Sequence, residues 1–178
     1  MPSGSVPDDD QSFKPPIEPG QPAPDFHLPD QTGRWVRLRD LLAPSRAGSA
    51  RRWVVLYFYP RDNTPGCTTE ACGFRDRHSD FKRQGAVVVG LSTDGEASHA
   101  KFAHKLALPF TLLADVDAQA AMAYGVWQQK KLYGKAFVGI VRTTFLIDPQ
   151  GRVAHRWDRV KSQDHEAEVL AKLREMRD

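Results

Sequence analysis

The run WVVLYFY at residues 53–59 constrains the fold more than any other segment of the chain. It is continuously apolar and rich in residues that favour β-structure, as expected for a strand buried on both faces. Seven residues are too few to cross a bilayer, which takes about 20, so the run predicts a central strand and no membrane span. The turn-forming residues PRDNTPG (60–66) follow at once, and a helix is expected next.

Strands and helices alternate through the rest of the chain. Apolar residues at helical spacing predict a helix over residues 67–84, with His78 in its core-facing stripe and Gly85 as its stop signal. The other expected elements are a hairpin over 26–38, strands at 86–92 and 110–115, helices at 96–106 and near 118–124, a second hairpin over 141–158 and an amphipathic helix at 164–176. This alternation predicts βαβ units, and therefore an α/β domain built on a mixed sheet.

The beginning of the chain differs in composition from the rest. Eight of the 13 prolines lie in residues 1–29, and proline-rich sequence does not form core helices. We expect residues 1–17 to be a flexible tail and residues 18–178 to form one domain. The tail has no apolar segment of the kind found in secretory signals, and its Asp8–Asp10 run argues against a transit peptide, so a cytoplasmic location is expected.

The positive charge of the chain is local. The formal net charge is +3, but residues 34–52 alone carry +5, so the remainder carries −2. A nucleic-acid-binding protein would show a broader basic face with interleaved aromatic residues. We therefore interpret this segment as a solvated loop and expect no nucleic-acid partner.

Two cysteines, Cys67 and Cys72, are too few for a disulfide framework or for a metal site of four thiolates. Cys67 follows a strand and a loop and stands at the start of a helix. There, unpaired amide N–H groups and the helix dipole favour the thiolate, which is the nucleophilic form. Cys67 is thus a candidate nucleophile, and the alternative is a small buried apolar residue.

In an intact helix the two cysteines point apart. Cys67 shares the core-facing stripe with Phe74, whereas Cys72 lies about 160° around the helix from that stripe. Their Cα atoms would be about 8.7 Å apart, and a disulfide needs about 7 Å or less. A bond between them requires the first turns of the helix to unwind, so a cycling redox pair is favoured over a static disulfide.

A metal site is the other use of such residues. His78, His99 and His104 could join the two thiols, but the 26 residues between Cys72 and His99 do not fit zinc-finger spacing. Copper binding of the type found in thioredoxin-like copper chaperones has no supporting motif. We expect no metal and no bound cofactor.

The segment FYPRDNTPGCTTEACGFRD (58–76) resembles the active site of the peroxiredoxins, specifically the bacterioferritin comigratory protein or PrxQ subfamily, in which two cysteines lie five apart on one helix. The resemblance extends to APDF (23–26), AYGVW (123–127), YGK (133–135) and GIVRTTFLID (139–148), and covers roughly residues 18–175. It implies a thioredoxin-like fold, which agrees with the mixed sheet predicted from the hydrophobic pattern.

The resemblance also implies roles for five residues. The family's proline, threonine and cysteine match Pro60, Thr64 and Cys67, and its active-site arginine matches Arg142. Cys67 would be the peroxidatic cysteine, which attacks the peroxide and becomes a sulfenic acid. Thr64 and Arg142 would orient the peroxide, Pro60 would shield the site from water, and Cys72 would be the resolving cysteine that forms the disulfide with Cys67.

The implied activity is that of a thioredoxin-dependent hydroperoxide reductase in antioxidant defence. Its substrates would be hydrogen peroxide and organic hydroperoxides, its reductant thioredoxin or a glutaredoxin-type protein, and its expected state a monomer. A protein thiol–disulfide oxidoreductase and a copper-binding chaperone are the alternatives. The first would have two residues between its cysteines, where this chain has four, and the second would need a histidine ligand near the pair. Apart from the resemblance, Thr64 could be a helix N-cap and Arg142 a solvated residue at a strand end.

Overall fold

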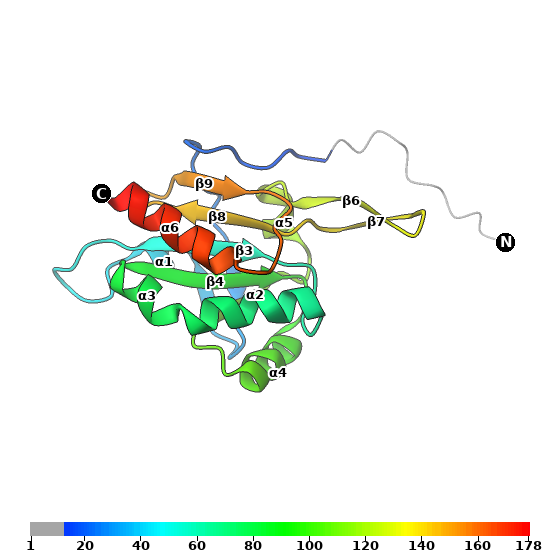
Figure 1. The fold of residues 1–178 in the computed structure, drawn as a ribbon, viewed down its shortest axis with the longest axis horizontal. Helices are drawn as coiled ribbons and strands as arrows, with labels where there is room; N and C mark the ends of the chain where they lie inside the picture. Colours follow the sequence, from blue (N-terminus) through cyan, green and yellow to red (C-terminus); the bar gives the residue numbers. More distant parts are fainter. Residues whose placement is uncertain (1–12) are drawn as a thin grey trace.

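The computed structural model describes residues 13–178 and centres on a mixed five-stranded sheet (Figure 1). In chain order the elements are β1 (His27–Pro29), β2 (Trp35–Arg37), α1 (Leu38–Leu42), β3 (Trp53–Phe58), α2 (Pro65–Asp76), α3 (His78–Arg83), β4 (Ala86–Ser92), α4 (Glu96–Leu106), β5 (Thr111–Ala114), α5 (Gln119–Ala123), β6 (Trp127–Leu132), β7 (Lys135–Ile140), β8 (Thr143–Ile147), β9 (Val153–Trp157) and α6 (His165–Arg177).

The central sheet has the strand order β5-β4-β3-β8-β9. Strands β3, β4 and β5 are parallel, whereas β8 runs antiparallel to both β3 and β9. The run that was predicted to be a central strand is β3, and it is the middle strand of the sheet. The α/β class, the mixed sheet and the two hairpins β1–β2 and β8–β9 are therefore confirmed.

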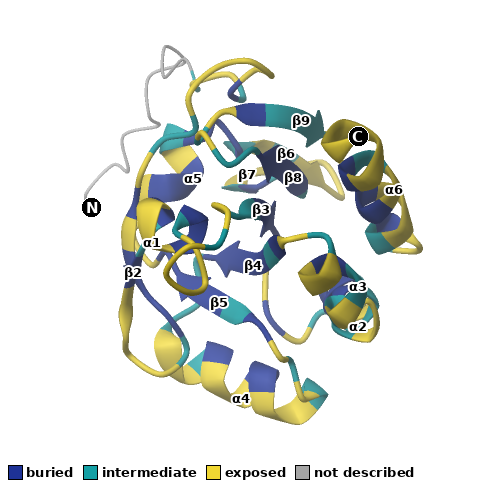
Figure 2. Ribbon diagram, turned by 90° about the vertical axis from the view of Figure 1, so that its left-hand side faces the viewer, coloured by how far each residue is buried: buried dark blue, intermediate teal, exposed yellow. Residues whose placement is uncertain are grey.

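Alternate residues of β3 enter two different cores, because successive side chains of a strand point to opposite faces of the sheet. Leu56 and Phe58 pack on the face covered by α1, α5 and the β1–β2 hairpin. Val55 and Tyr57 pack on the face covered by α2, α3 and α6. Figure 2 shows this sheet as a buried layer between helices whose outer surfaces are exposed. Within residues 13–178, none of the helices combines the length and the apolarity needed to cross a membrane.

The helix predicted over residues 67–84 is interrupted. It begins two residues earlier, at Pro65, and Arg77 leaves the helical conformation at φ −105° and ψ 9°, which separates α2 from α3. Phe74 and Phe81 are nevertheless both fully buried on the same core. Hydrophobic periodicity reports which side faces the core, and a one-residue break leaves that side unchanged. His78, placed by the pattern in the core stripe, begins α3 and is only half-buried.

Strands β6 and β7 form a hairpin that the sequence analysis did not predict. Tyr133 and Gly134 join them with φ of 51° and 76°, the two positive values that a tight type I′ turn requires. The hairpin extends beyond the end of the central sheet (Figure 1), and within it only Ile140 is buried. A strand pair with so little burial has no strong apolar alternation, so the hydrophobic pattern carried little signal for it.

Residues 13–17, expected in the flexible tail, instead pack on the domain. Ile17 is buried and donates its N–H to the Tyr124 carbonyl, and the Lys14 ammonium donates to the Ala123 carbonyl over 2.8 Å. The main chain at Pro15 lies directly against Gly125, whose φ is 75°. Because of these contacts, the packed part of the chain begins before residue 18, the expected start of the domain. Residues 1–12 of the expected tail lie outside the described residues.

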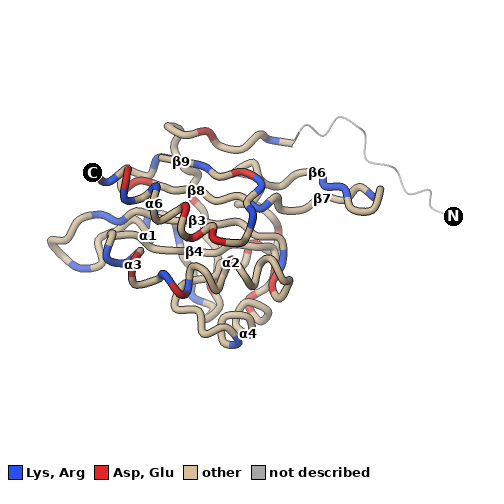
Figure 3. The backbone as a smooth tube through the Cα atoms, viewed as in Figure 1, with Lys and Arg blue, Asp and Glu red and all other residues tan. Residues whose placement is uncertain are grey.

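The arginine-bearing loop lies between α1 and β3, and Figure 3 shows its blue segments at one end of the molecule. Arg51 donates to the Pro149 carbonyl, and Arg52 donates to the carbonyls of Ala43 and Asp40. Two of the arginines thus fasten the loop to its neighbours. Since the loop precedes β3 and Cys67 follows β3, the loop and Cys67 stand at opposite ends of that strand.

Candidate active site

Cys67 stands in the first turn of α2, which follows β3 after a loop of six residues, 59–64. Proline at the first position of a helix loses no hydrogen bond, because the N–H groups of the first turn have no intrahelical partner. Pro65 holds that position here, and Thr64 is the extended residue before it. Cys67 is 1% exposed and belongs to the same core as Tyr57 and Phe74. The sulfur is therefore close to free helical N–H groups and largely removed from water.

Arg142 reaches the cysteine from the residue before β8, the strand that pairs with β3. In the antiparallel pairing of β3 with β8, Thr143 is the partner of Phe58, so the residue before Thr143 lies beside the loop that leaves β3. The Arg142 guanidinium donates from Nη2 to Cys67 Sγ over 3.2 Å. Gly66 leaves room for this approach, because a Cβ there would lie 3.1 Å from Nη2. A fixed cation beside the sulfur stabilises its thiolate form.

Glu70 completes the contact, and the sequence analysis did not identify it. It lies three residues after Cys67, one helical turn along α2, and its Oε1 accepts a 2.8 Å hydrogen bond from Arg142 Nη1. The guanidinium is thereby held between a carboxylate and a sulfur. Burial opposes the charge on Arg142, but Glu70 and Cys67 outweigh it and raise its pKa above the ordinary value. Arg142 therefore stays cationic in this site.

The Glu70 carboxyl is itself buried, which disfavours its charged form. It is 1% exposed, and among the described residues its Oε2 has no hydrogen-bond partner. Loss of hydration raises the pKa of Glu70 from 4.5 to about 7, against the opposing influence of Arg142. The group is thus close to half-protonated at neutral pH, and the charge of the site changes over the physiological range.

The raised pKa of Glu70 predicts a pH dependence of stability with a definite sign. Between about pH 4.5 and pH 7 the folded protein holds this proton more tightly than the unfolded chain does, so stability falls as pH rises through that window. The loss attributable to Glu70 is roughly 3 kcal/mol. The unfolding free energy of the parent and of Glu70→Gln is measured by urea unfolding, with reductant, at pH 4.5 and at pH 7.5. The contribution of Glu70 is the fall between the two pH values in the parent minus the fall in the variant. Equal falls in the two proteins would contradict the argument.

Cys72 lies on the other side of α2, as the helical geometry predicts. It is half-buried and lines a surface hollow together with Thr68 and Glu166. Both cysteines are free thiols, and α2 is continuous from Pro65 to Asp76. The helix is held against α6 directly after Cys72, because Glu166 packs where a Cβ on Gly73 would stand.

Pro60 and Thr64 lie on the loop between β3 and α2, and both are half-buried. Thr64 is the N-cap residue of α2, but its side chain makes no capping hydrogen bond. Its hydroxyl instead donates to the Arg61 carbonyl over 2.9 Å. Within residues 13–178 no group donates a hydrogen bond to Thr64 Oγ1, so this oxygen can accept one. Of the five residues singled out from the sequence, Cys67 and Arg142 are in direct contact, Pro60 and Thr64 precede Cys67 on the loop after β3, and Cys72 faces away.

Metal-ligand geometry occurs elsewhere. Among residues 13–178, the side chains that converge closely enough for a cation are Asp62, Asp94 and His99, a group that contains neither cysteine. His99, which the sequence analysis considered as a partner for the thiols, binds Asp62 and the Leu113 carbonyl instead.

Known proteins of one family share this architecture. The model of the AhpC/TSA family matches residues 19–156. Peroxiredoxin Bcp of Bacillus subtilis is 48% identical over 160 residues, which cover 90% of this chain and 97% of the relative. The crystal structure of the peroxidoxin BcpB of Mycobacterium tuberculosis superposes with a TM-score of 0.79 at 39% identity, over 91% of this chain and 99% of that one.

A third relative is the bacterioferritin comigratory protein of Xanthomonas campestris, solved as trapped intermediate and ligand complexes in connection with its alkyl peroxide reduction activity. It matches with a TM-score of 0.78 at 36% identity, over 86% of this chain and 92% of that chain. The predicted thioredoxin-like fold is confirmed by these structural neighbours. With matches of this extent in both sequence and structure, the chain belongs to the AhpC/TSA family and, within it, to the Bcp/PrxQ peroxiredoxins.

Proposed function

We propose that this chain reduces hydrogen peroxide and organic hydroperoxides through a cycle in which Cys67 is the peroxidatic and Cys72 the resolving cysteine. The observation that supports this most directly is the 3.2 Å hydrogen bond from Arg142 to Cys67 Sγ. A sulfur that is buried, placed in the first turn of a helix and bonded to a cation is prepared to react as a thiolate.

In the first step, the Cys67 thiolate attacks one peroxide oxygen and the O–O bond breaks. A sulfenic acid forms on Cys67, and the second oxygen leaves with the bonding electrons and takes a proton to become water or an alcohol. The Arg142 N–H groups would stabilise the charge that develops on the oxygens. The Thr64 hydroxyl would accept a hydrogen bond from the peroxide, and Pro60 would exclude water from the pocket.

In the second step, Cys72 attacks the Cys67 sulfur and releases water, which leaves a disulfide between them. Two electrons and two protons from an external dithiol then restore both thiols. We propose thioredoxin, or a glutaredoxin-type protein, as that dithiol. The monomeric state and the cytoplasmic location stay predictions.

A thiol count tests this cycle. One equivalent of hydrogen peroxide should consume both thiols of the reduced parent protein. In Cys72→Ser, the same treatment should leave a sulfenic acid on Cys67 that a dimedone-type reagent traps and mass spectrometry locates. If both thiols survive minutes of exposure, the pair is not peroxidatic, and disulfide exchange with proteins and copper binding become the functions to test.

The separation of the two cysteines predicts a structural change on oxidation. Because Cys67 and Cys72 lie on different sides of an intact helix, their disulfide should unwind the beginning of α2 and loosen its backbone hydrogen bonds. Amide hydrogen exchange over residues 67–74 should therefore be faster in the oxidised protein than in the reduced one. The amides of β3, which form the centre of the sheet, serve as the internal reference. Equal protection of residues 67–74 in both states would contradict the unwinding.

A further inference from the structure

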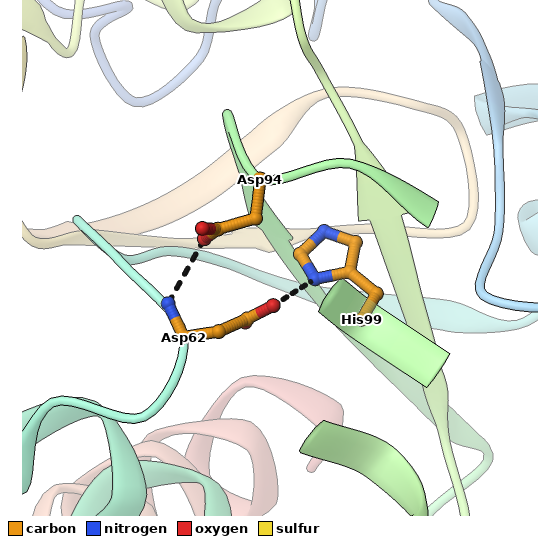
Figure 4. A group of neighbouring side chains, drawn as sticks. All are labelled: Asp62, Asp94 and His99. Carbon is orange, nitrogen blue, oxygen red and sulfur yellow. Dashed lines mark hydrogen bonds and ion pairs between the residues drawn. The ribbon is translucent and has the colours of Figure 1, made fainter. Parts of the chain in front are cut away.

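One buried side chain, that of Asp62, attaches the loop that carries Pro60 and Thr64 to the domain. The Asp62 side chain is 2% exposed and points toward His99 (Figure 4). Its Oδ1 accepts a 2.6 Å hydrogen bond from the Tyr59 hydroxyl, and its Oδ2 accepts one of 2.8 Å from Ser98 Oγ. Its backbone N–H donates to Asp94 Oδ2 over 2.9 Å. One residue thus ties the loop to α4 and to the segment after β4.

His99 of α4 makes the remaining contact, and both of its ring nitrogens face acceptors. Nδ1 lies 2.8 Å from Asp62 Oδ2, and Nε2 lies 2.9 Å from the Leu113 carbonyl on β5. A carbonyl oxygen can only accept a hydrogen bond, and the same is true of a carboxylate oxygen. With Asp62 ionised, both contacts are hydrogen bonds only if both ring nitrogens carry hydrogen, which makes the ring an imidazolium. The ring is fully buried, so an unmade hydrogen bond here would be costly.

The other half of the pair is a carboxylate. Burial raises the pKa of Asp62, but the hydrogen bonds from His99 and Tyr59 outweigh burial and bring its pKa below the ordinary value. Tyr59 and Ser98 both donate to Asp62, which also requires acceptor oxygens. The contact between the two side chains therefore joins opposite charges inside the protein, where few competing partners exist.

Three of the four carboxylate oxygens of this cluster already accept hydrogen bonds. The candidate ligand atoms of Asp62, Asp94 and His99 all lie within 4.8 Å of one another. However, Asp94 Oδ2 already accepts from the Asp62 N–H and the Ser92 hydroxyl, and Asp62 uses both of its oxygens. The 2.8 Å separation between Asp62 and His99 is that of a donor and its acceptor. The geometry is that of an anchor for the loop.

We propose that His99 and Asp62 form a buried imidazolium–carboxylate pair that positions the Pro60–Thr64 loop for peroxide binding, which makes His99 a positioning residue of the reaction. The inference rests on the proposed function, since it assumes that Pro60 and Thr64 belong to the peroxide pocket. Asp62 stands midway between these two residues, and the next residue, Asn63, has a left-handed backbone at φ 63°. Misplacement of a substrate-binding group by about 1 Å can cost on the order of 100-fold in rate.

Two substitutions of His99 separate its two hydrogen bonds. In His99→Asn the amide nitrogen stands near the position of Nδ1 and keeps a donor for Asp62. In His99→Gln it stands near the position of Nε2 and keeps a donor for Leu113 only. Both replace a buried ring with a smaller amide, so the general loss of packing is similar. His104→Gln, at an exposed position of the same helix, is the control for the substitution itself.

The rate of Cys67 oxidation by hydrogen peroxide is compared with its rate of alkylation by iodoacetamide, which needs the thiolate but no peroxide pocket. For His99→Gln we expect the peroxide rate to fall at least about 10-fold and the alkylation rate to stay within about twofold of the parent. His99→Asn should retain the peroxide rate within about threefold, and His104→Gln should match the parent. Equal losses in Asn and Gln variants, an unchanged His99→Gln, or a parallel fall in alkylation would overturn the proposal.

The charge state of His99 is tested in the unaltered protein, so the proposal remains falsifiable if a variant does not fold. The ¹⁵N chemical shifts of both His99 ring nitrogens at pH 7 should be those of protonated imidazolium nitrogens. A neutral-ring pattern would overturn the ion pair. Failure of the proposed function looks different: the parent would not react with peroxide at Cys67, whereas the ring shifts would still report the pair.

Discussion

Cys67→Ser should reduce peroxide turnover to below about one thousandth of the parent value, the largest effect expected of any single substitution in this chain. The serine hydroxyl keeps its proton at neutral pH even beside the Arg142 guanidinium, whereas the thiolate is the species that attacks the O–O bond. The substitution exchanges one small atom at a buried position, so the fold should persist. The measurement is peroxide consumption with excess dithiothreitol, together with a circular dichroism melt.

Cys72→Ser is the matched control for this experiment. It removes the second thiol but leaves the contact between Cys67 and Arg142 intact, so the first attack should proceed at the parent's rate. A stopped-flow trace of the initial oxidation separates that step from turnover. Retained turnover in Cys67→Ser would show that Cys67 is not the peroxidatic cysteine. Loss of the first oxidation step in Cys72→Ser but not in Cys67→Ser would show the same.

Arg142→Met should produce the second largest effect, a loss of about 100- to 1000-fold in the rate of Cys67 oxidation. Methionine has a similar length but supplies neither the charge nor the N–H donors that the developing oxyanion needs. The same change leaves Glu70 buried without the partner to which Oε1 is bonded. We expect the unfolding free energy to fall by about 1–3 kcal/mol as a result.

The double variant Arg142→Met/Glu70→Gln separates these two consequences. The neutral amide removes the buried carboxyl, so stability should return toward that of the parent, while the oxidation rate should stay low. The rate is followed by stopped-flow fluorescence and the stability by urea unfolding under reducing conditions. Recovery of the rate in the double variant would show that Arg142→Met acts through loss of stability, and that the guanidinium is not needed for the chemistry.

Most of the secondary structure followed from patterns that depend on neighbouring residues alone. The apolar run that became β3, the two hairpins and α6 with Val169, Leu170 and Leu173 buried were all expected. Two of the errors have a common cause. The break at Arg77 leaves the buried side of the helix unchanged, and the β6–β7 hairpin buries little, so neither alters the hydrophobic pattern from which elements are read.

For the candidate site, the sequence by itself determined that Cys67 stands at the start of a helix after a buried strand, and that Cys72 faces the other way. The family resemblance added Pro60, Thr64 and Arg142. Only the tertiary structure placed the Arg142 guanidinium on a sulfur 75 residues away, because that contact depends on the register of β8 against β3. It alone also gave Glu70 and His99 their partners. Local periodicity encodes which side of an element is buried, whereas the partner of a buried charge is decided by how distant segments pair.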